Sequence, residues 1–64
     1  MNTDLIVMEV RTNGHEQPIH EHTFSRETFT KESGVLTLLD LDPNSSVTID
    51  KPVIKQSITY YFQP

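Results

Sequence analysis

The fold is decided by the stretch LIVMEV at residues 5–10. This run is rich in β-branched residues and apolar on both alternating faces, which is typical of a strand that is covered on two sides. Asn13 and Gly14 follow it closely, and this dipeptide is a strong signal for a tight turn. We therefore expect a buried strand that ends in a turn.

Three further segments favour strands. The run VLTLLDL at residues 35–41 predicts a second apolar strand, and DPNSS at residues 42–46 predicts a turn after it. Residues 47–50 alternate between apolar and polar side chains, and Lys51-Pro52 interrupts that alternation. In residues 53–62 one face is apolar and is expected to point inward. Its members are Ile54, Ile58, Tyr60 and Phe62, with Gln56 as the one polar residue.

Residues 19–31 support two interpretations. Their threonines and phenylalanines favour extended chain. Alternatively, Ser25 is able to cap a short helix that Gly34 would end. We predict a strand here and keep one short helical turn near residues 25–33 as the alternative. Together the segments predict a single all-β domain over residues 1–64, a small antiparallel meander, barrel or sandwich of five to six short strands.

Composition argues against several classes of protein. The chain has 64 residues, of which 34% are hydrophobic, so its core is small. It has no cysteine, which excludes disulfides and thiolate metal sites. Its five basic residues are scattered and its net charge is −4, which argues against nucleic-acid binding. No segment approaches the apolar length needed to cross a membrane, and no signal peptide is apparent. We expect a cytoplasmic protein.

All three histidines lie within HEQPIHEH at residues 15–22. In a strand, His20 and His22 are two positions apart, so both rings project from the same face. Two imidazoles in that arrangement are able to bind one divalent metal ion, with Glu27 as the natural third ligand if the chain folds back near Ser25. Two other interpretations stay open. The segment is either a solvated polar arm or a pH sensor whose imidazoles charge together near their unperturbed pKa of about 6.5.

Five residues stand at the spacing G-x5-H-x-H-x4-E-x6-G: Gly14, His20, His22, Glu27 and Gly34. This pattern resembles the first motif of the cupin family, small β-barrels in which the two histidines and the glutamate of that motif help to hold a divalent metal ion. Residues 35–49 also look like the corresponding part of a cupin, with two strands around a polar turn. The second cupin motif has no counterpart in residues 52–64, so the resemblance is to a degenerate or minimal member.

Two functions follow from these patterns. The first is a non-catalytic protein-interaction or accessory regulatory module that acts as a homo-oligomer or through a protein partner, because a small open sheet leaves edges able to pair. Tyr61, on the outward face of its segment, is the interface candidate, since tyrosine is favoured at interfaces. The alternative, implied by the resemblance, is a cupin-like domain that binds a divalent metal ion or a small ligand through His20, His22 and Glu27. No motif places a nucleophile beside a base, so we expect no catalytic residues.

Overall fold

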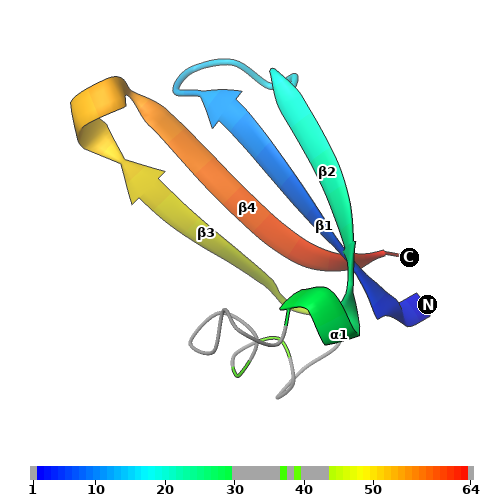
Figure 1. The fold of residues 1–64 in the computed structure, drawn as a ribbon. Coiled ribbons are helices and arrows are strands. Elements are labelled where there is room, and N and C mark those ends of the chain that lie inside the picture. Colours follow the sequence, from blue (N-terminus) through cyan, green and yellow to red (C-terminus); the bar gives the residue numbers. More distant parts are fainter. Residues whose placement is uncertain (1, 30–36, 38, 40–43, 64) are drawn as a thin grey trace.

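The computed structural model describes residues 2–29, 37, 39 and 44–63, which form one antiparallel sheet with a short helix near one end (Figure 1). The elements are β1 (Asn2–Thr12), β2 (His20–Ser25), α1 (Arg26–Phe29), β3 (Ser46–Lys51), the 3-10 helix η1 (Pro52–Ile54) and β4 (Gln56–Gln63). The strand order is β2-β1-β4-β3, so β1 and β4 are central and β2 and β3 are the edges. The all-β class is confirmed, but the described residues form four strands rather than the five to six predicted.

A strand forms within residues 19–31 as predicted, but that strand is shorter than expected, and the preference for a strand is wrong after Ser25. β2 ends at Ser25, and α1 begins at the next residue. The Ser25 hydroxyl accepts a hydrogen bond from the Thr28 backbone N–H at 3.1 Å, which is the N-terminal cap that the alternative interpretation required. This local cap outweighs the strand preference of Thr28 and Phe29, so the helical turn is correct. Gly34, its predicted end, lies outside the described residues.

The strand expected at residues 35–41 lies almost wholly outside the described residues. Only Thr37 and Leu39 of that run are described, and both have helical backbone, so the strand prediction is wrong at these two positions. A short apolar run does not distinguish a buried strand from a buried helical segment by its periodicity, which explains the error. Leu39 is nevertheless completely buried, as its apolar character indicates.

The register of the ladders sorts the side chains onto two faces. Along β1, Ile6 pairs with Phe24 of β2 and Phe62 of β4, and Met8 pairs with His22 and Tyr60. Side chains alternate along each strand, and paired residues on neighbouring strands point to the same side, so these pairs assign the strand residues to two faces. The inner face comprises Ile6, Met8, Val10, Thr12, His20, His22, Phe24, Val47, Ile49, Lys51, Gln56, Ile58, Tyr60 and Phe62. The outer face comprises Leu5, Val7, Glu9, Arg11, Glu21, Thr23, Ser25, Ser46, Thr48, Asp50, Ser57, Thr59 and Tyr61.

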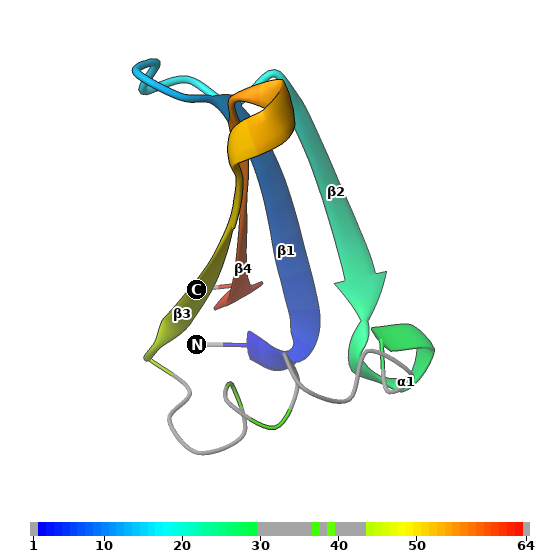
Figure 2. The ribbon, with the colours of Figure 1, turned by 90° about the vertical axis from the view of Figure 1, so that its left-hand side faces the viewer.

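The core lies on the inner face at the end of the sheet where α1 sits (Figure 2). Its buried members are Ile6, Phe29, Leu39 and Phe62, and Phe24, Val47 and Tyr60 pack against them. The Phe29 ring lies 5.4 Å from that of Phe24 on β2 and 5.2 Å from that of Tyr60 on β4, so α1 packs one aromatic side chain onto the inner face between these two rings. Val7 is also buried, on the outer face, so β1 is covered on both sides at that position, whereas Leu5, Glu9 and Arg11 on the same face are only partly covered.

Two turns join the strands at the opposite end of the sheet. The first follows β1, where His15 N–H donates to the Thr12 carbonyl at 3.0 Å and Gly14 takes a positive φ of 89°. A positive φ at that position requires glycine or a tolerant residue, so the Asn13-Gly14 turn is confirmed. The second turn is η1, and Lys55, which follows it, has a left-handed backbone with φ 55°. Ile54 therefore lies in η1 and is exposed, and its predicted inward position is wrong.

Candidate functional site

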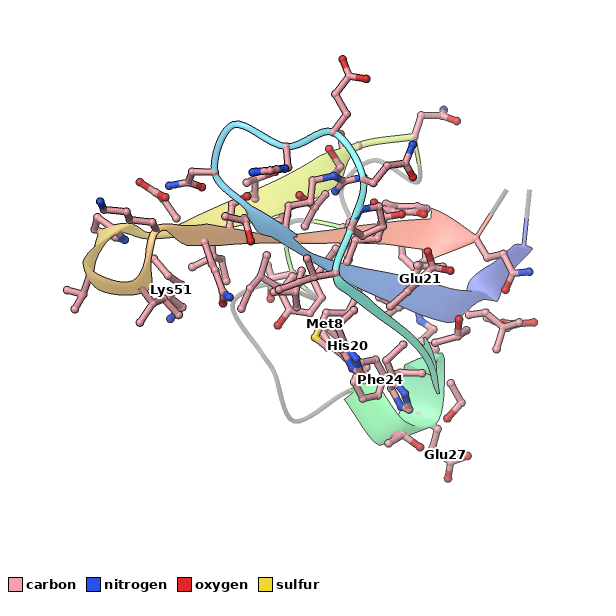
Figure 3. The ribbon with its side chains drawn as sticks, turned by 90° about the horizontal axis from the view of Figure 1, so that it is seen from above. Met8, His20, Glu21, Phe24, Glu27 and Lys51 are labelled. Carbon is pink, nitrogen blue, oxygen red and sulfur yellow. The ribbon has the colours of Figure 1, made fainter. Side chains whose placement is uncertain are left out.

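The histidine pair lies on the edge strand β2. His20 pairs with Val10 of β1 and His22 with Met8, so both imidazoles belong to the inner face, as the sequence predicts. The His22 ring packs edge-on against Phe24 at 4.4 Å. Figure 3 shows His20 on the same side of the sheet as Met8 and Phe24. Both histidines are exposed, so a ligand or a partner has access to them.

Glu27, the predicted third metal ligand, lies on α1 rather than on a strand facing the histidines. In Figure 3 it points away from His20, and it lines a cavity together with Asp4, Ser25 and Arg26. Among the residues that the structure describes, no group of three histidine, aspartate or glutamate side chains is placed to hold a metal ion. The described geometry therefore brings the two histidines to one face and leaves Glu27 apart from them. A metal site at these residues stays a prediction.

His15 lies apart from the other two histidines. It is exposed in the β1–β2 connection, where its backbone N–H closes the turn. His20 and His22 lie two residues apart on β2, beyond that connection. The pH-sensing interpretation of the three histidines stays a prediction.

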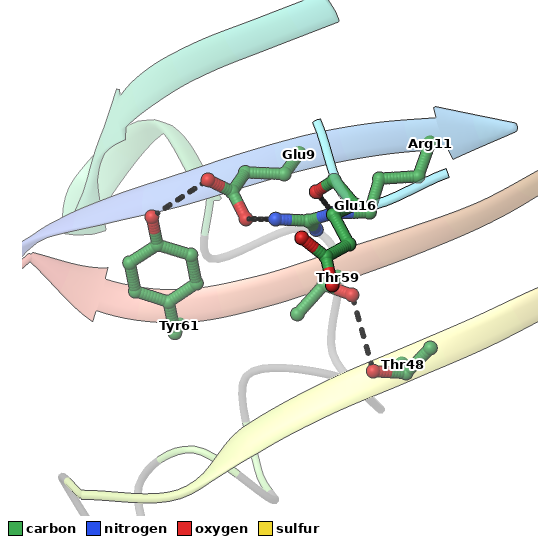
Figure 4. A network of polar contacts seen from close by, with 6 residues as sticks. All are labelled: Glu9, Arg11, Glu16, Thr48, Thr59 and Tyr61. Carbon is green, nitrogen blue, oxygen red and sulfur yellow. Dashed lines mark hydrogen bonds and ion pairs between the residues drawn. The ribbon is translucent and has the colours of Figure 1, made fainter. Parts of the chain in front are cut away.

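A polar network on the outer face joins Glu9, Arg11 and Tyr61 (Figure 4). The Glu9 carboxylate accepts a hydrogen bond from the Tyr61 hydroxyl at 3.1 Å and pairs with Arg11 Nη2 at 2.7 Å. Arg11 Nε in turn donates to the Glu16 carbonyl at 2.9 Å. The network thus ties β4 to β1 and ties β1 to the connection that leads to β2.

The surroundings of Tyr61 favour its neutral, protonated form. Burial raises the pKa of the Tyr61 phenol, and the hydrogen bond to the Glu9 carboxylate adds to the rise because phenolate cannot donate it. The negative charges of Glu9 and Glu21 act in the same direction, and Arg11 opposes them. The predicted outward position of Tyr61 is confirmed, while its part in an interface stays a prediction. Sequence reasoning missed Glu9 and Arg11, although opposite charges two residues apart on a strand share a face.

Apolar side chains are exposed at the end of the sheet opposite α1. Ile19 is 60% exposed, Val53 is 94% exposed and Ile54 is 60% exposed. Both ribbon views place η1 and the β1–β2 connection, which carry these residues, at this end (Figures 1 and 2). The backbone N–H of Asn13 donates to the Lys55 carbonyl at 2.9 Å, which joins the two turns. We call Ile19, Val53 and Ile54 the apolar end.

Comparisons with protein-family models, with curated proteins and with solved structures find no match for this chain. Among the described residues, no helix is long and apolar enough to cross a membrane.

Proposed function

We propose that the chain is a non-catalytic interaction module that acts by associating with itself or with a protein partner. The observation that supports this most is the apolar end, where three large aliphatic side chains are exposed at the same end of the sheet. Single exposed aliphatic residues are ordinary on protein surfaces, but a group of them marks an interaction site more often. The Asn13–Lys55 hydrogen bond ties the turn after β1 to η1, so these two turns keep a fixed position relative to each other.

The small size of the core is a second reason to expect association. Five apolar side chains are buried among the described residues, while Met8, Val10, Ile49 and Ile58 on the inner face are only partly covered there. Chains of this size are marginally stable alone and often gain stability from a partner. An accessory or regulatory role in which binding stabilises the fold is therefore physically reasonable.

The test is a capture experiment with a matched pair of variants. The triple variant Ile19→Ser/Val53→Ser/Ile54→Ser removes the apolar end, and Glu21→Ser/Thr23→Ser removes exposed side chains on the outer face of β2 as the control. Substitutions at such exposed positions change the free energy of unfolding by only about 0.5 kcal/mol each. We expect the wild type and the control to retain the same protein partner and the triple variant to lose it. The proposal is refuted if the wild type is monomeric in light scattering and captures no protein partner, or if every protein that it captures is also captured by the triple variant.

A second candidate function is binding of a divalent metal ion on β2. The observation that favours it is that His20 and His22 share the inner face and are both exposed. The cupin resemblance implies Glu27 as a further ligand. In calorimetric titrations with Zn²⁺, Ni²⁺, Mn²⁺ and Fe²⁺ this proposal predicts binding that His20→Ala/His22→Ala abolishes and His15→Ala preserves. It also predicts a rise in Tm on metal addition, because a ligand of the folded state alone stabilises it. Titrations without heat of binding in the wild type exclude it.

A further inference from the structure

The two edges of the sheet differ in how well they are protected from pairing with another strand. Natural edges carry charges, proline or bulges that discourage such pairing. β2 carries two imidazoles and Glu21, and Glu21 already faces Glu9 across the ladder, so a strand added at this edge meets acidic charge. β3 has the sequence SVTIDK and a continuous register with β4, without a bulge or a proline.

The β3 edge is also electrically balanced, although the whole chain is acidic. Its two charged residues, Asp50 and Lys51, have opposite signs and stand at one end of the strand. In the described part of the chain, the backbone hydrogen bonds outside the strand ladders lie in the β1–β2 connection and around η1, and none involves β3. Half of the backbone groups of an edge strand point away from its sheet. The four residues Ser46–Ile49 therefore offer an uncharged, extended edge.

The alternation of β3 limits how two copies of it can pair. A symmetric antiparallel pair keeps inner-face side chains next to inner-face side chains only when its two-fold axis passes through a residue. An axis at Ile49 sets Val47 against Lys51 and brings Pro52, which has no N–H, against Ser46. An axis at Thr48 pairs every residue from 46 to 50 and leaves Pro52 outside the ladder.

We propose that β3 pairs antiparallel with β3 of a second copy of this chain, with the two-fold axis at Thr48. This deepens the interaction-module proposal and rests on it, since it names a second copy as a partner and gives β3 as the surface for it, separate from the apolar end. On the outer face, Thr48 then lies beside its own copy, and it already contacts Thr59 through their hydroxyls at 3.1 Å (Figure 4). Threonine pairs of this kind stabilise adjacent strands.

The same register also forms apolar pairs on the inner face and a polar pair on the outer face between the two copies. On the inner face, Val47 lies opposite Ile49 of the second copy, so two β-branched pairs form and the apolar row from Tyr60 to Val47 is extended. On the outer face, Ser46 lies opposite Asp50 of the second copy, which gives the carboxylate a hydroxyl donor. No position between 46 and 50 places like charges opposite each other.

The first test compares the same substitution at the two edges. Thr48 and Thr23 are both exposed threonines on the outer face of an edge strand, so Thr48→Lys and Thr23→Lys are matched. At the proposed axis, Thr48→Lys places two ammonium groups side by side, which disfavours pairing. In sedimentation velocity from micromolar to millimolar concentration, we expect a dimer for the wild type and Thr23→Lys and a monomer for Thr48→Lys. Circular dichroism verifies that each variant is folded.

The second test fixes the register and does not depend on a loss of association. The chain has no cysteine, so a single introduced thiol reports on its own copy. At the axis the two Cα atoms of residue 48 are about 4.5 or 5.5 Å apart, depending on the type of pair. Both distances suit a disulfide. Under mild oxidation we expect Thr48→Cys to form a covalent dimer much faster than Ile49→Cys or Thr23→Cys.

The outcomes separate this inference from the proposal on which it rests. A dimer that persists in Thr48→Lys, or a Thr48→Cys variant that cross-links no faster than Thr23→Cys, overturns pairing through β3 and leaves self-association through another surface. A wild type that is monomeric at every concentration overturns the second copy as the partner. The interaction module itself is then decided by the capture experiment with the apolar-end variant.

Discussion

Replacing Phe29 by alanine tests the claim that one aromatic side chain holds α1 against the sheet. Phe29 is 3% exposed and is the buried residue of this four-residue helix. An aromatic side chain buries about 150–250 Å², which at about 25 cal/mol per Å² corresponds to about 4–6 kcal/mol. Alanine retains the Cβ, so we expect Phe29→Ala to lower the free energy of unfolding by about 3–5 kcal/mol. A chain of this length has about 3–10 kcal/mol in total, so the variant stands near the limit of folding.

The assay is urea unfolding followed by circular dichroism, with two reference variants. Phe29→Leu keeps most of the apolar volume and is expected to lower the free energy of unfolding by only about 1–1.5 kcal/mol, which leaves a measurable transition. Val53→Ala, at a side chain that is 94% exposed, is expected to change it by less than about 0.5 kcal/mol. Equal transition midpoints for Phe29→Leu, Phe29→Ala and Val53→Ala, with unchanged denaturant slopes, would refute the packing argument.

Three further changes test the cap, the left-handed turn and the outer-face network. Ser25→Ala removes the oxygen that accepts the Thr28 N–H and is expected to destabilise the chain by about 1 kcal/mol in thermal unfolding, whereas Ser25→Asp retains the cap and the stability. Lys55 adopts a left-handed backbone, so we expect Lys55→Gly to be neutral or stabilising and Lys55→Val to be destabilising by about 1–2 kcal/mol; the opposite order contradicts the assigned φ. Folding raises the pKa of Tyr61, so its contribution to stability is fully present below the unfolded tyrosine pKa of about 10 and is lost as the pH rises through the folded pKa. We expect Tyr61→Phe to weaken this alkaline loss of stability. If the wild type and Tyr61→Phe lose stability equally from about pH 9 upward, that is, from about one unit below the unfolded tyrosine pKa, the network does not contribute as proposed.

The sequence predicts the parts of this fold that depend on strand alternation. β1, β3 and β4 fall within a few residues of their predicted segments. The run in β1 is apolar on both faces, and the runs in β3 and β4 alternate between an apolar and a more polar face. The assignment of Tyr60 and Phe62 to the inner face and Tyr61 to the outer face follows from the same alternation. The Asn13-Gly14 turn is predicted correctly because its chemistry is local.

The errors arise where one local contact or the packing of a few side chains decides the backbone. At residues 26–29 the preferences for strand are real, and a single hydroxyl of Ser25 overrides them. At Leu39 the apolar character correctly predicts burial, but the backbone is helical and not the predicted strand. For the candidate site, the shared face of His20 and His22 follows from spacing alone, whereas the place of Glu27 depends on α1. The pairing of Glu9 with Tyr61 depends on the neighbour of β1 in the sheet, which spacing does not reveal.

The strand order has a consequence for the route by which this chain reaches its structure. The two central strands, β1 and β4, come from opposite ends of the sequence, and β3 joins the sheet only through β4. The hairpin of β1 with β2 is local, but most of the inner-face core, including Phe62, requires a loop that encloses nearly the whole chain. Closing such a loop costs entropy before its contacts form, so folding is expected to be slow for so short a protein. During synthesis the β1–β2 hairpin emerges long before its central partner exists, and until then the apolar side of β1 has no β4 to pack beside it.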